Sequence, residues 1–356
     1  MSRSRTKTLD GREQRLQRLV DRAAESRHVH SVLLGVETAN REISIRAAAG
    51  AAHPGDSYAV ASITKMFTAS IVMQLVDESQ LDLHDRVADL LPSLDLNGIH
   101  RHGGVDRSSE LELHHLLHQT SGLPDYFAGK VEDDMKQNRD RHYSIEDIIG
   151  IARSVDAEFP PGDRNGSRSS YSDTNYQLLT AVIEAATGTT YAEAVHQRIA
   201  QRLGLEHTWV AGHRSVAPAL PLHHQDKRLD LPKTLASERG AGGIISTLDD
   251  QLEFMRAYHA DQLFDQRHSH QVWNRIFFPV DYGHGLMRYQ VPRWMTGFRR
   301  TPELIGHSGS SNSFAFYAPE LGCHIAGTMN QLDNPARAFR LLVKVAALIR
   351  STQKGA

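Results

Sequence analysis

The sequence predicts an α+β fold in which strands from both ends of the chain form one sheet. Two observations indicate this arrangement. Strand-like runs occur near the start, at 31–37 and 41–48, and again near the end, at 314–320 and 323–330. Between them, residues 80–235 alternate helical stretches with loops rich in Gly, Pro and Asp. We therefore expect a helical insertion between the two parts of the sheet.

The N-terminal segment predicts an amphipathic helix followed by two paired strands. Residues 12–27 place four apolar side chains on one stripe of a helix, namely Leu16, Leu19, Val20 and Ala23. The runs SVLLGVE (31–37) and REISIRAA (41–48) are typical of strands. The short segment 38–40 predicts the turn between them.

The segment 64–77 predicts a helix that is buried on every side. Its sequence, TKMFTASIVMQLVD, is apolar around almost the whole helical circumference rather than along one stripe. A helix with this pattern belongs in the interior of a protein. Farther along, residues 174–188 predict another helix, and residues 335–351 predict a final one after the last two strands.

Composition and charge exclude several functional classes. The 356 residues include 40 Lys and Arg against 42 Asp and Glu, so the basic surplus of a nucleic-acid binder is missing. The one cysteine, Cys323, allows neither an intramolecular disulfide nor a cysteine-based zinc site. The charged start lacks the apolar core of a signal peptide, and no apolar run is long enough to span a membrane. We expect a cytoplasmic protein that binds neither nucleic acid nor membrane; its oligomeric state stays open.

Ser62 and Lys65 are the first candidates for catalytic chemistry. A serine hydroxyl is a weak nucleophile that needs a partner to remove its proton. A spacing of three places the lysine on the same helix face as the serine. The same spacing recurs once in each polar tail, but only Ser62 precedes a buried helix, which can hold a lysine in a dry pocket. The alternative is a helix-capping serine with a lysine that reaches solvent.

Two further motifs carry polar groups. Tyr171-Ser172-Asp173 lies in a polar loop before the helix predicted at 174–186, and a tyrosine beside a lysine ammonium can relay a proton. The alternative is a loop tyrosine with Asp173 capping that helix. The segment 306–310, Gly-His-Ser-Gly-Ser, precedes a predicted strand. Small residues there would let a substrate lie along a sheet edge, whereas the alternative is a simple turn.

Together, the three motifs resemble those of the penicillin-recognising serine hydrolases, in the same order and at similar spacing. This group includes class C β-lactamases, D-alanyl-D-alanine carboxypeptidases, D-aminopeptidases and family VIII carboxylesterases. The segment 58–68 resembles the nucleophile segment of the family. The segments 113–124 and 240–247 resemble its RHLLTHTSGLP and AGGLxST stretches. The resemblance covers about residues 16–350.

The resemblance implies a β-lactamase/transpeptidase-like fold, with an antiparallel sheet flanked by helices and a mostly helical domain. The implied sheet domain is discontinuous and consists of residues 1–78 and 236–356. Residues 79–235 would form the mainly helical domain. The active site would lie between the two domains, and the resemblance implies neither a cofactor nor a metal.

The resemblance also implies a role for each motif residue. Ser62 would attack a carbonyl and form an acyl-enzyme, with Lys65 as general base or proton shuttle. Tyr171 would protonate the leaving group and activate the second nucleophile. The oxyanion hole would consist of the backbone N–H groups of Ser62 and Ser310. The other implied substrate-binding residues are Asp173, His307, Ser308 and Gly309.

Two residues depart from the family pattern. Asp173 stands where the family usually has Asn, and a carboxylate cannot donate a hydrogen bond to a substrate carbonyl. It would also pair with Lys65 and hold it as an ammonium, which makes Tyr171 the favoured base. His307 replaces the Lys of most β-lactamases, as in some peptidases and esterases of the family, and so removes a permanent cation. Both departures disfavour efficient β-lactam hydrolysis.

Other interpretations fit less of the sequence. His114, His115 and His118 suggest a metal cluster, but they lie in a family structural segment and no HExxH frame accompanies them. The segment 306–310 nearly matches the GxSxG elbow of α/β-hydrolases, but its last residue is Ser and a parallel-sheet pattern is missing. A catalytically silent binding protein would not need all three reactive groups.

We therefore expect a serine hydrolase or acyltransferase whose substrate is a small-molecule ester or amide. The alternatives are, in order, a D-amino-acid-specific peptidase or amidase and a β-lactamase. From a different class, the remaining alternative is a catalytically silent ligand-binding member of the fold. The sequence leaves open the acyl group, the leaving group, and whether water or an amine accepts the acyl group.

Overall fold

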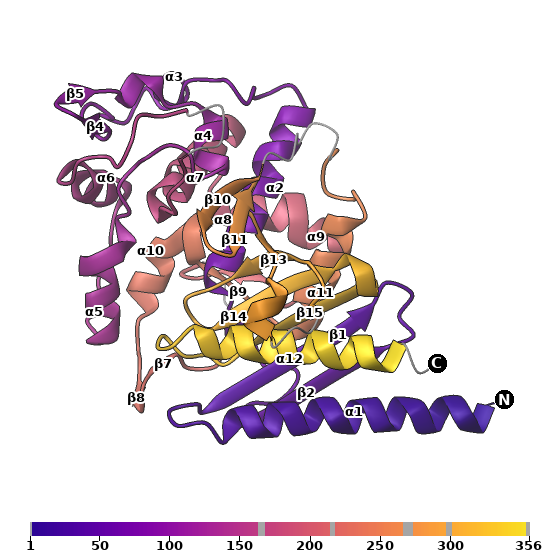
Figure 1. Ribbon diagram of the computed structural model, residues 1–356. Helices are drawn as coiled ribbons and strands as arrows, with labels where there is room; N and C mark the ends of the chain where they lie inside the picture. The colour runs from indigo at the N-terminus through magenta and orange to yellow at the C-terminus, as the bar shows by residue number, and fades with distance from the viewer. Residues whose placement is uncertain (1, 163–167, 214–217, 266–272, 297–300, 354–356) are drawn as a thin grey trace.

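An eight-stranded antiparallel sheet forms the centre of the protein (Figure 1). The computed structural model of the protein describes residues 2–162, 168–213, 218–265, 273–296 and 301–353. The spatial order of the strands is β10-β11-β12-β13-β14-β15-β1-β2. Their bounds are β1 (Ser31–Thr38), β2 (Ser44–Gly50), β10 (Asn274–Phe277), β11 (Val280–Gly283), β12 (Leu286–Tyr289), β13 (Leu304–Ser308), β14 (Ser313–Ala318) and β15 (Cys323–Thr328).

The sheet joins the two ends of the chain, as the sequence predicts. β1 pairs with β2 along one edge and with β15 along the other, with Leu33 opposite both Ala48 and Thr328. β2 begins at Ser44, three residues later than predicted, because the turn before it is longer. The Thr38 N–H donates to the Ile43 carbonyl (2.9 Å), and the Ile43 N–H donates to Thr38 Oγ1 (3.0 Å).

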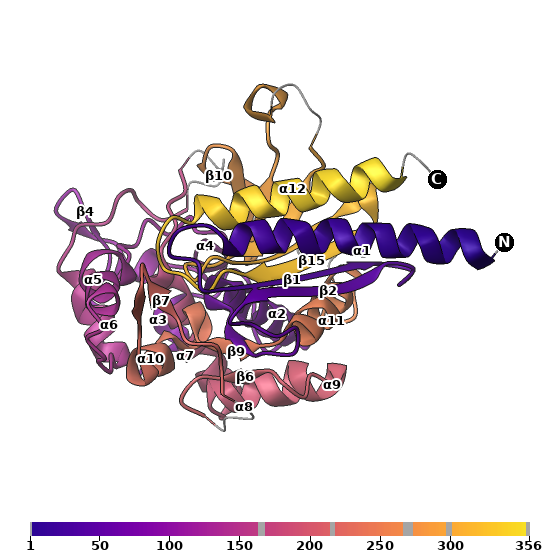
Figure 2. The ribbon, with the colours of Figure 1, turned by 90° about the horizontal axis from the view of Figure 1, so that it is seen from below.

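Helices cover both faces of the sheet. α1 (Ser2–Ala24) and α12 (Ala336–Gln353) lie side by side on one face, and α11 (Leu248–His259) packs on the other (Figures 1 and 2). Both views place the two termini at the same end of the molecule. α1 begins ten residues before the predicted start and ends earlier than residue 27.

α2 (Thr64–Asp77) is the predicted fully buried helix, and it begins and ends where the sequence predicts. Its residues from Thr64 to Leu75 are all buried. It packs against α7 (Asp173–Thr187), α8 (Tyr191–Val195) and α10 (Pro232–Gly242). α2 therefore contacts helices that come from both the middle and the later part of the chain.

Most of the remaining elements are short. The other helices are α3 (Val87–Leu90), α4 (Leu113–Leu117), α5 (Glu132–Lys136), α6 (Ile145–Arg153) and α9 (Gln201–Leu203). Three two- or three-residue strands, β3 (Tyr58–Ala59), β9 (Ile244–Ser246) and β6 (Trp209–Val210), form a small sheet. The hairpins β4 (Arg101–His102) with β5 (Val105–Asp106) and β7 (His223–His224) with β8 (Lys227–Arg228) complete the strands of the described chain.

The eight strands of the main sheet all fall within residues 31–50 and 274–328. The helices α3 to α9 fall within residues 87–203. This distribution supports the proposed division into a sheet domain (1–78 and 236–356) and a mainly helical domain (79–235). Within the described chain, each helix is too short or too polar to cross a bilayer.

Candidate active site

Ser62 lies in a single 3₁₀ turn, η1 (Ala61–Ile63), immediately before α2. Its hydroxyl oxygen accepts a hydrogen bond from Lys65 Nζ at 3.1 Å. Ala61, the preceding residue, has a φ of +50°, a conformation that costs a non-glycine residue about 1–3 kcal/mol and is common at functional sites. The backbone before Ser62 is therefore held in an unfavourable conformation by the structure around it.

Strand β14 and the turn before it hold the Ser62 segment in place. The hydroxyl of Ser313 donates to the Val60 carbonyl (2.6 Å), and that of Ser311 donates to the Ala59 carbonyl (2.9 Å). A Cβ on Gly309 would lie 2.7 Å from the Val60 oxygen, closer than real side chains come. Gly309 therefore allows the third motif to approach the serine segment closely.

Lys65 is completely buried and surrounded by hydrogen-bond acceptors. Nζ donates to Ser62 Oγ and, at 2.6 Å, to the carbonyl of Ala241, and it forms an ion pair with Asp173. Three acceptors match the three N–H groups of an ammonium. The ion pair that the sequence predicts between Lys65 and Asp173 is therefore present, and the interpretation of Lys65 as a lysine that reaches solvent is wrong.

Asp173 is the first residue of α7, but its carboxylate does not cap that helix. Ser172 occupies the N-cap position, and no side chain makes a capping hydrogen bond there. The Asp173 N–H donates to the carboxylate of Asp125 (3.0 Å), a residue of the loop that follows α4. The capping interpretation of Asp173 is thus wrong, since its side chain is committed to Lys65.

Tyr171 lies beside the lysine, with Lys65 Nζ 5.0 Å from the centre of its ring. Burial raises the pKa of the Tyr171 phenol well above its ordinary value, and the Asp173 carboxylate raises it further; contact with Ser62 acts in the opposite direction. Tyr171 therefore keeps its proton at neutral pH. The sequence-based interpretation of Tyr171 as the base is disfavoured, because burial, and after it the charge of Asp173, opposes a phenolate.

The third motif lies between two strands of the main sheet. Residues 304–308 form β13, so the motif ends one strand and, as predicted, precedes another, β14. Ser308, Gly309 and Ser310 line the cleft described below. The α/β-hydrolase interpretation is wrong, because β13 belongs to an antiparallel sheet and Ser308 does not sit in a strand-to-helix turn.

His307 is not among the residues that line the cleft, but its ring centre lies 6.2 Å from that of Tyr171, and its role in substrate binding stays a prediction. Its ring is fully buried, with Nδ1 2.7 Å from the Ser308 carbonyl oxygen and Nε2 3.3 Å from the Tyr282 hydroxyl. Burial lowers the pKa of His307 to about 3, and the nearby charge of Lys65 contributes to this shift. The imidazole is therefore neutral.

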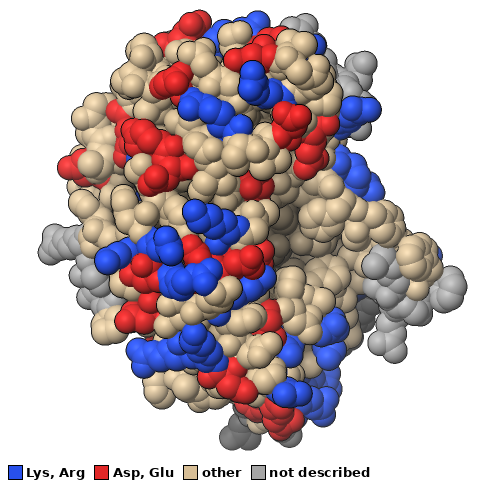
Figure 3. Space-filling model, turned by 90° about the vertical axis from the view of Figure 1, so that its left-hand side faces the viewer, with Lys and Arg blue, Asp and Glu red and all other residues tan. Residues whose placement is uncertain are grey.

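A cleft of about 370 Å³ opens in front of Ser62. The face that carries α5 and α10, shown in Figure 3, is hollowed near its centre, and charged side chains border the hollow. Ser62, Tyr171, Asp173 and Ser310 all line the cleft. Its other lining side chains are mostly apolar and include Phe127, Met135, Leu222, Leu235, Phe277, Met287 and Leu332.

Three cleft carboxylates were missed by the sequence interpretation, and two of them, Asp125 and Glu238, lie deep in the cleft beside Asp173. Burial raises the pKa of Glu238 to about 8 and that of Asp125 to about 7, and the charge of Asp173 adds to both shifts. Each flanks a segment that resembles the family, 113–124 and 240–247. That adjacency was the available signal, but an isolated acidic residue in a loop or helix is usually at the surface.

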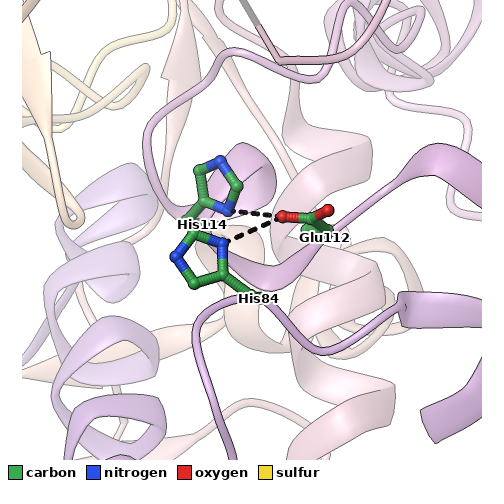
Figure 4. A group of neighbouring side chains, drawn as sticks. All are labelled: His84, Glu112 and His114. Carbon is green, nitrogen blue, oxygen red and sulfur yellow. Dashed lines mark hydrogen bonds and ion pairs between the residues drawn. The ribbon is translucent and has the colours of Figure 1, made fainter. Parts of the chain in front are cut away.

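The three histidines near α4, already disfavoured as a metal site from the sequence, do not converge. His115 Nδ1 accepts the Glu112 N–H (3.0 Å), whereas His118 Nε2 lies 3.0 Å from Nε2 of His284. His114 instead joins His84 at the carboxylate of Glu112 (Figure 4), with both Nδ1 atoms 3.1–3.3 Å from the same oxygen. A metal held by the three predicted histidines is therefore excluded by their positions.

Sequence similarity to a known protein family covers most of the chain. The profile of the family described as Beta-lactamase matches residues 16–348. Penicillin-binding protein 4* of Bacillus subtilis is 24% identical over 277 residues, which are 71% of this chain and 55% of that protein. The chain thus spans about half, or less, of the length of the curated relatives it matches.

Two solved structures share the fold over nearly their whole length. A D-stereospecific amidohydrolase from a Streptomyces species is 26% identical with a TM-score of 0.75, covering 92% of this chain and 97% of that one. A D-amino acid amidase from Ochrobactrum anthropi, complexed with L-phenylalanine amide, is 21% identical with a TM-score of 0.78, covering 97% and 99%. These similarities confirm the β-lactamase/transpeptidase-like fold.

Proposed function

The chain belongs to the Beta-lactamase family of serine hydrolases, and from this premise we propose that it forms an acyl-enzyme on Ser62 with an ester or a small amide. One observation carries the proposal. The Ser62 hydroxyl lines the cleft while its oxygen lies 3.1 Å from the buried Lys65 amine. A nucleophile held in hydrogen-bond contact with a basic group is what acyl transfer needs.

Acylation begins with proton movement along the Asp173–Lys65 ion pair. Asp173 takes one proton from Lys65, and the resulting amine accepts the Ser62 proton as Oγ bonds to the substrate carbonyl carbon. Tyr171 then gives its proton to the leaving group and regains one from Lys65, which recovers its own from Asp173. Because its pKa is raised, Tyr171 starts protonated and so has a proton to give to the leaving group. Water, or an amine, reverses these steps to release the acyl group.

The oxyanion of the tetrahedral intermediate needs two hydrogen-bond donors in the cleft. Ser62 and Ser310 both line the cleft, and their backbone N–H groups are the proposed donors. Each such donor is worth about 2.7–4 kcal/mol to the transition state. Ser308 and Gly309 bring Ser310 to this position at the end of β13.

A D-amino-acid amidase or peptidase is the second candidate. The structural similarity to a D-stereospecific amidohydrolase and a D-amino acid amidase favours it. A β-lactamase is disfavoured, since the neutral, buried His307 offers no cation for a substrate carboxylate and Asp173 offers no amide donor.

The test combines active-site labelling with a substrate screen. A fluorophosphonate should label the wild type, and a p-nitrophenyl ester or a D-aminoacyl amide should be turned over faster than a chromogenic cephalosporin. Ser62→Ala should lose both labelling and turnover. A wild type that neither reacts with the fluorophosphonate nor turns over any substrate would indicate a silent binding protein instead. A mass-shifted adduct on Ser62→Ala would identify another nucleophile.

A further inference from the structure

Two carboxylates deep in the cleft have no part in the proposed acyl transfer. Glu238 of α10 and Asp125 of the loop after α4 both line the cleft beside Asp173. Glu238 is 5% exposed, and its Oε2 accepts a hydrogen bond from the Tyr126 hydroxyl at 3.0 Å. Its other oxygen, Oε1, is buried without a hydrogen-bond partner in the described part of the chain. An unpartnered buried carboxylate oxygen at the wall of a cleft is a free acceptor for a ligand.

Glu238 lies close to the nucleophile segment. A Cβ placed on Gly242, another cleft residue, would lie 3.3 Å from Glu238 Oε2 and 3.8 Å from the carbonyl carbon of Ala61. Ala61 directly precedes Ser62. A group that contacts Glu238 would therefore stand within a few atoms of a carbonyl under attack by Ser62.

The charge of the cleft is unbalanced toward the negative. Of the four cleft carboxylates, Glu132 is paired with Lys136 at the rim; the other three, Asp125, Asp173 and Glu238, face one buried cation, Lys65, which is already paired with Asp173. Asp125 accepts two backbone N–H groups, those of Phe127 and Asp173, but neither carries a full charge. A second positive charge in the cleft would relieve the repulsion among these carboxylates.

We propose that Glu238 binds a substrate ammonium group, with Asp125 and Asp173 adding negative potential, so that the acyl group transferred to Ser62 carries a protonated amine close to its carbonyl. The inference rests on the proposed function and names its substrate class: esters or amides of amino acids whose amine is free. The ammonium donates a hydrogen bond to Glu238 Oε1, and its alkyl portion lies against the apolar lining of the cleft.

An organic ammonium fits this arrangement better than a metal ion does. In the described chain, the trio of His, Asp or Glu side chains whose ligand atoms lie within 4.8 Å of one another is His84, Glu112 and His114, which includes none of the cleft carboxylates. The three cleft carboxylates are thus too widely spread to chelate one ion. Their raised pKa values, about 8 for Glu238 and 7 for Asp125, indicate that the empty cleft disfavours the charges which an ammonium would stabilise.

The test uses substrates of equal shape that differ in charge. D- and L-alanine p-nitroanilides carry the ammonium, and isobutyryl p-nitroanilide replaces it with a methyl group; methyl esters serve if anilides are not cleaved. At pH 7 the wild type should prefer one alanine substrate over the isobutyryl one by at least about 10-fold in kcat/KM. Glu238→Gln should lower that ratio by about 10-fold or more, whatever it does to either rate, and Asp125→Asn should lower it less.

Glu132→Gln is the matched control. Glu132 also lines the cleft, but it is ion-paired with Lys136 and more than a third exposed, so the ratio should stay within about twofold of wild type. A wild type without preference for the ammonium, or a folded Glu238→Gln with an unchanged ratio, overturns the inference. If that same wild type is labelled at Ser62 and hydrolyses the isobutyryl substrate, the proposed function stands and only the ammonium site is wrong.

Discussion

At the scale of single residues, the hydrogen-bond and ion-pair partners of Lys65 define the site. The Nζ atom contacts the nucleophile, a backbone carbonyl and Asp173, so each of its protons already has an acceptor. Burial raises the pKa of Tyr171, and the Asp173 carboxylate raises it further. Lys65, Asp173 and Tyr171 therefore exchange the same protons, and a change at one of them alters the protonation of the other two.

Lys65→Ala and Tyr171→Phe should show this dependence directly. Each single change should lower kcat by about 10²–10⁴-fold, because each removes a group that handles the same proton. The double variant should lose little more than the worse single variant. Steady-state or single-turnover rates on one ester measure the three losses. Losses that multiply would show that the two residues work independently.

Asp173→Asn should change the choice between substrates. The amide of Asn can donate to a substrate carbonyl, which a carboxylate cannot. Amides and β-lactams need that donor more than esters do, since esters are intrinsically more reactive. The amide-to-ester ratio of kcat/KM should therefore rise by about 5- to 10-fold. An unchanged ratio would mean that the side chain at this position does not reach the substrate carbonyl.

At the scale of elements, the helix α2 and the turn between β13 and β14 hold the nucleophile from opposite sides. The buried helix α2 carries Lys65 one turn beyond Ser62, so the distance between amine and hydroxyl follows from helix geometry. The turn between β13 and β14 presses against the backbone before Ser62 through Gly309, Ser311 and Ser313. The strain at Ala61 is retained because both neighbours are rigid.

Gly309→Ala should damage catalysis through this contact. The new methyl group would lie 2.8 Å from the Ala61 Cβ and 2.7 Å from the Val60 oxygen, so the serine segment must shift. A displacement of about 1 Å at a nucleophile costs about 100-fold in rate, and we expect a loss of that size in kcat/KM.

Gly150→Ala is the control for the glycine substitution. Gly150 lies in α6 with no atom within 4 Å of an added Cβ, so the change should keep full activity and raise stability slightly. Hydrolysis of one ester and thermal melts compare the two variants. Full activity in Gly309→Ala would show that the turn does not position Ser62.

At the scale of the whole molecule, folding brings acidic residues from distant segments into one buried cleft. Asp125, Asp173 and Glu238 come from a loop and two helices, and they face one another together with Lys65 and the Tyr126 hydroxyl. Folding thus raises the pKa of two carboxyls above their unfolded values. These raised pKa values lower the free energy of unfolding of the whole protein at neutral and alkaline pH.

Thermal stability should accordingly fall as the pH rises. A carboxyl whose pKa is higher in the folded state binds its proton more tightly there. Glu238 therefore opposes folding progressively between its unfolded pKa near 4.5 and its folded pKa of about 8. Asp125 acts in the same direction up to about 7. Between pH 6 and pH 9 the Tm should drop by about 2–5 °C from this source.

Glu238→Gln should flatten this dependence and melt above the wild type at pH 9. Differential scanning calorimetry of both proteins across the range measures the effect. The control Glu132→Gln, with its partly exposed carboxyl, should follow the wild-type curve. Parallel curves for Glu238→Gln and wild type would contradict the buried charge assigned to Glu238.

Local patterns in the sequence were sufficient for the buried helix, for the strands nearest the two ends of the chain and for the residues that share one turn or one motif, but not for strands β10 to β13. The all-round apolar run at 64–77 gave the bounds of α2, since burial on every side leaves a signal in any window of the chain. Strand-like runs near both ends of the chain predicted that the two ends share one sheet, as β1 and β15 do. The likeness of three motifs to a family predicted the site around Ser62, and the structure brings Lys65, Asp173 and Tyr171 to it.

Only the tertiary structure decided what each polar group can do. His307 stands in a motif that suggests a substrate contact, yet burial keeps its imidazole neutral. Tyr171 keeps its proton because it is buried and because Asp173 lies beside it, and Glu238 enters the site from a helix with no motif of its own. Burial and electrostatic coupling depend on neighbours that are distant in sequence, so no local pattern contains them.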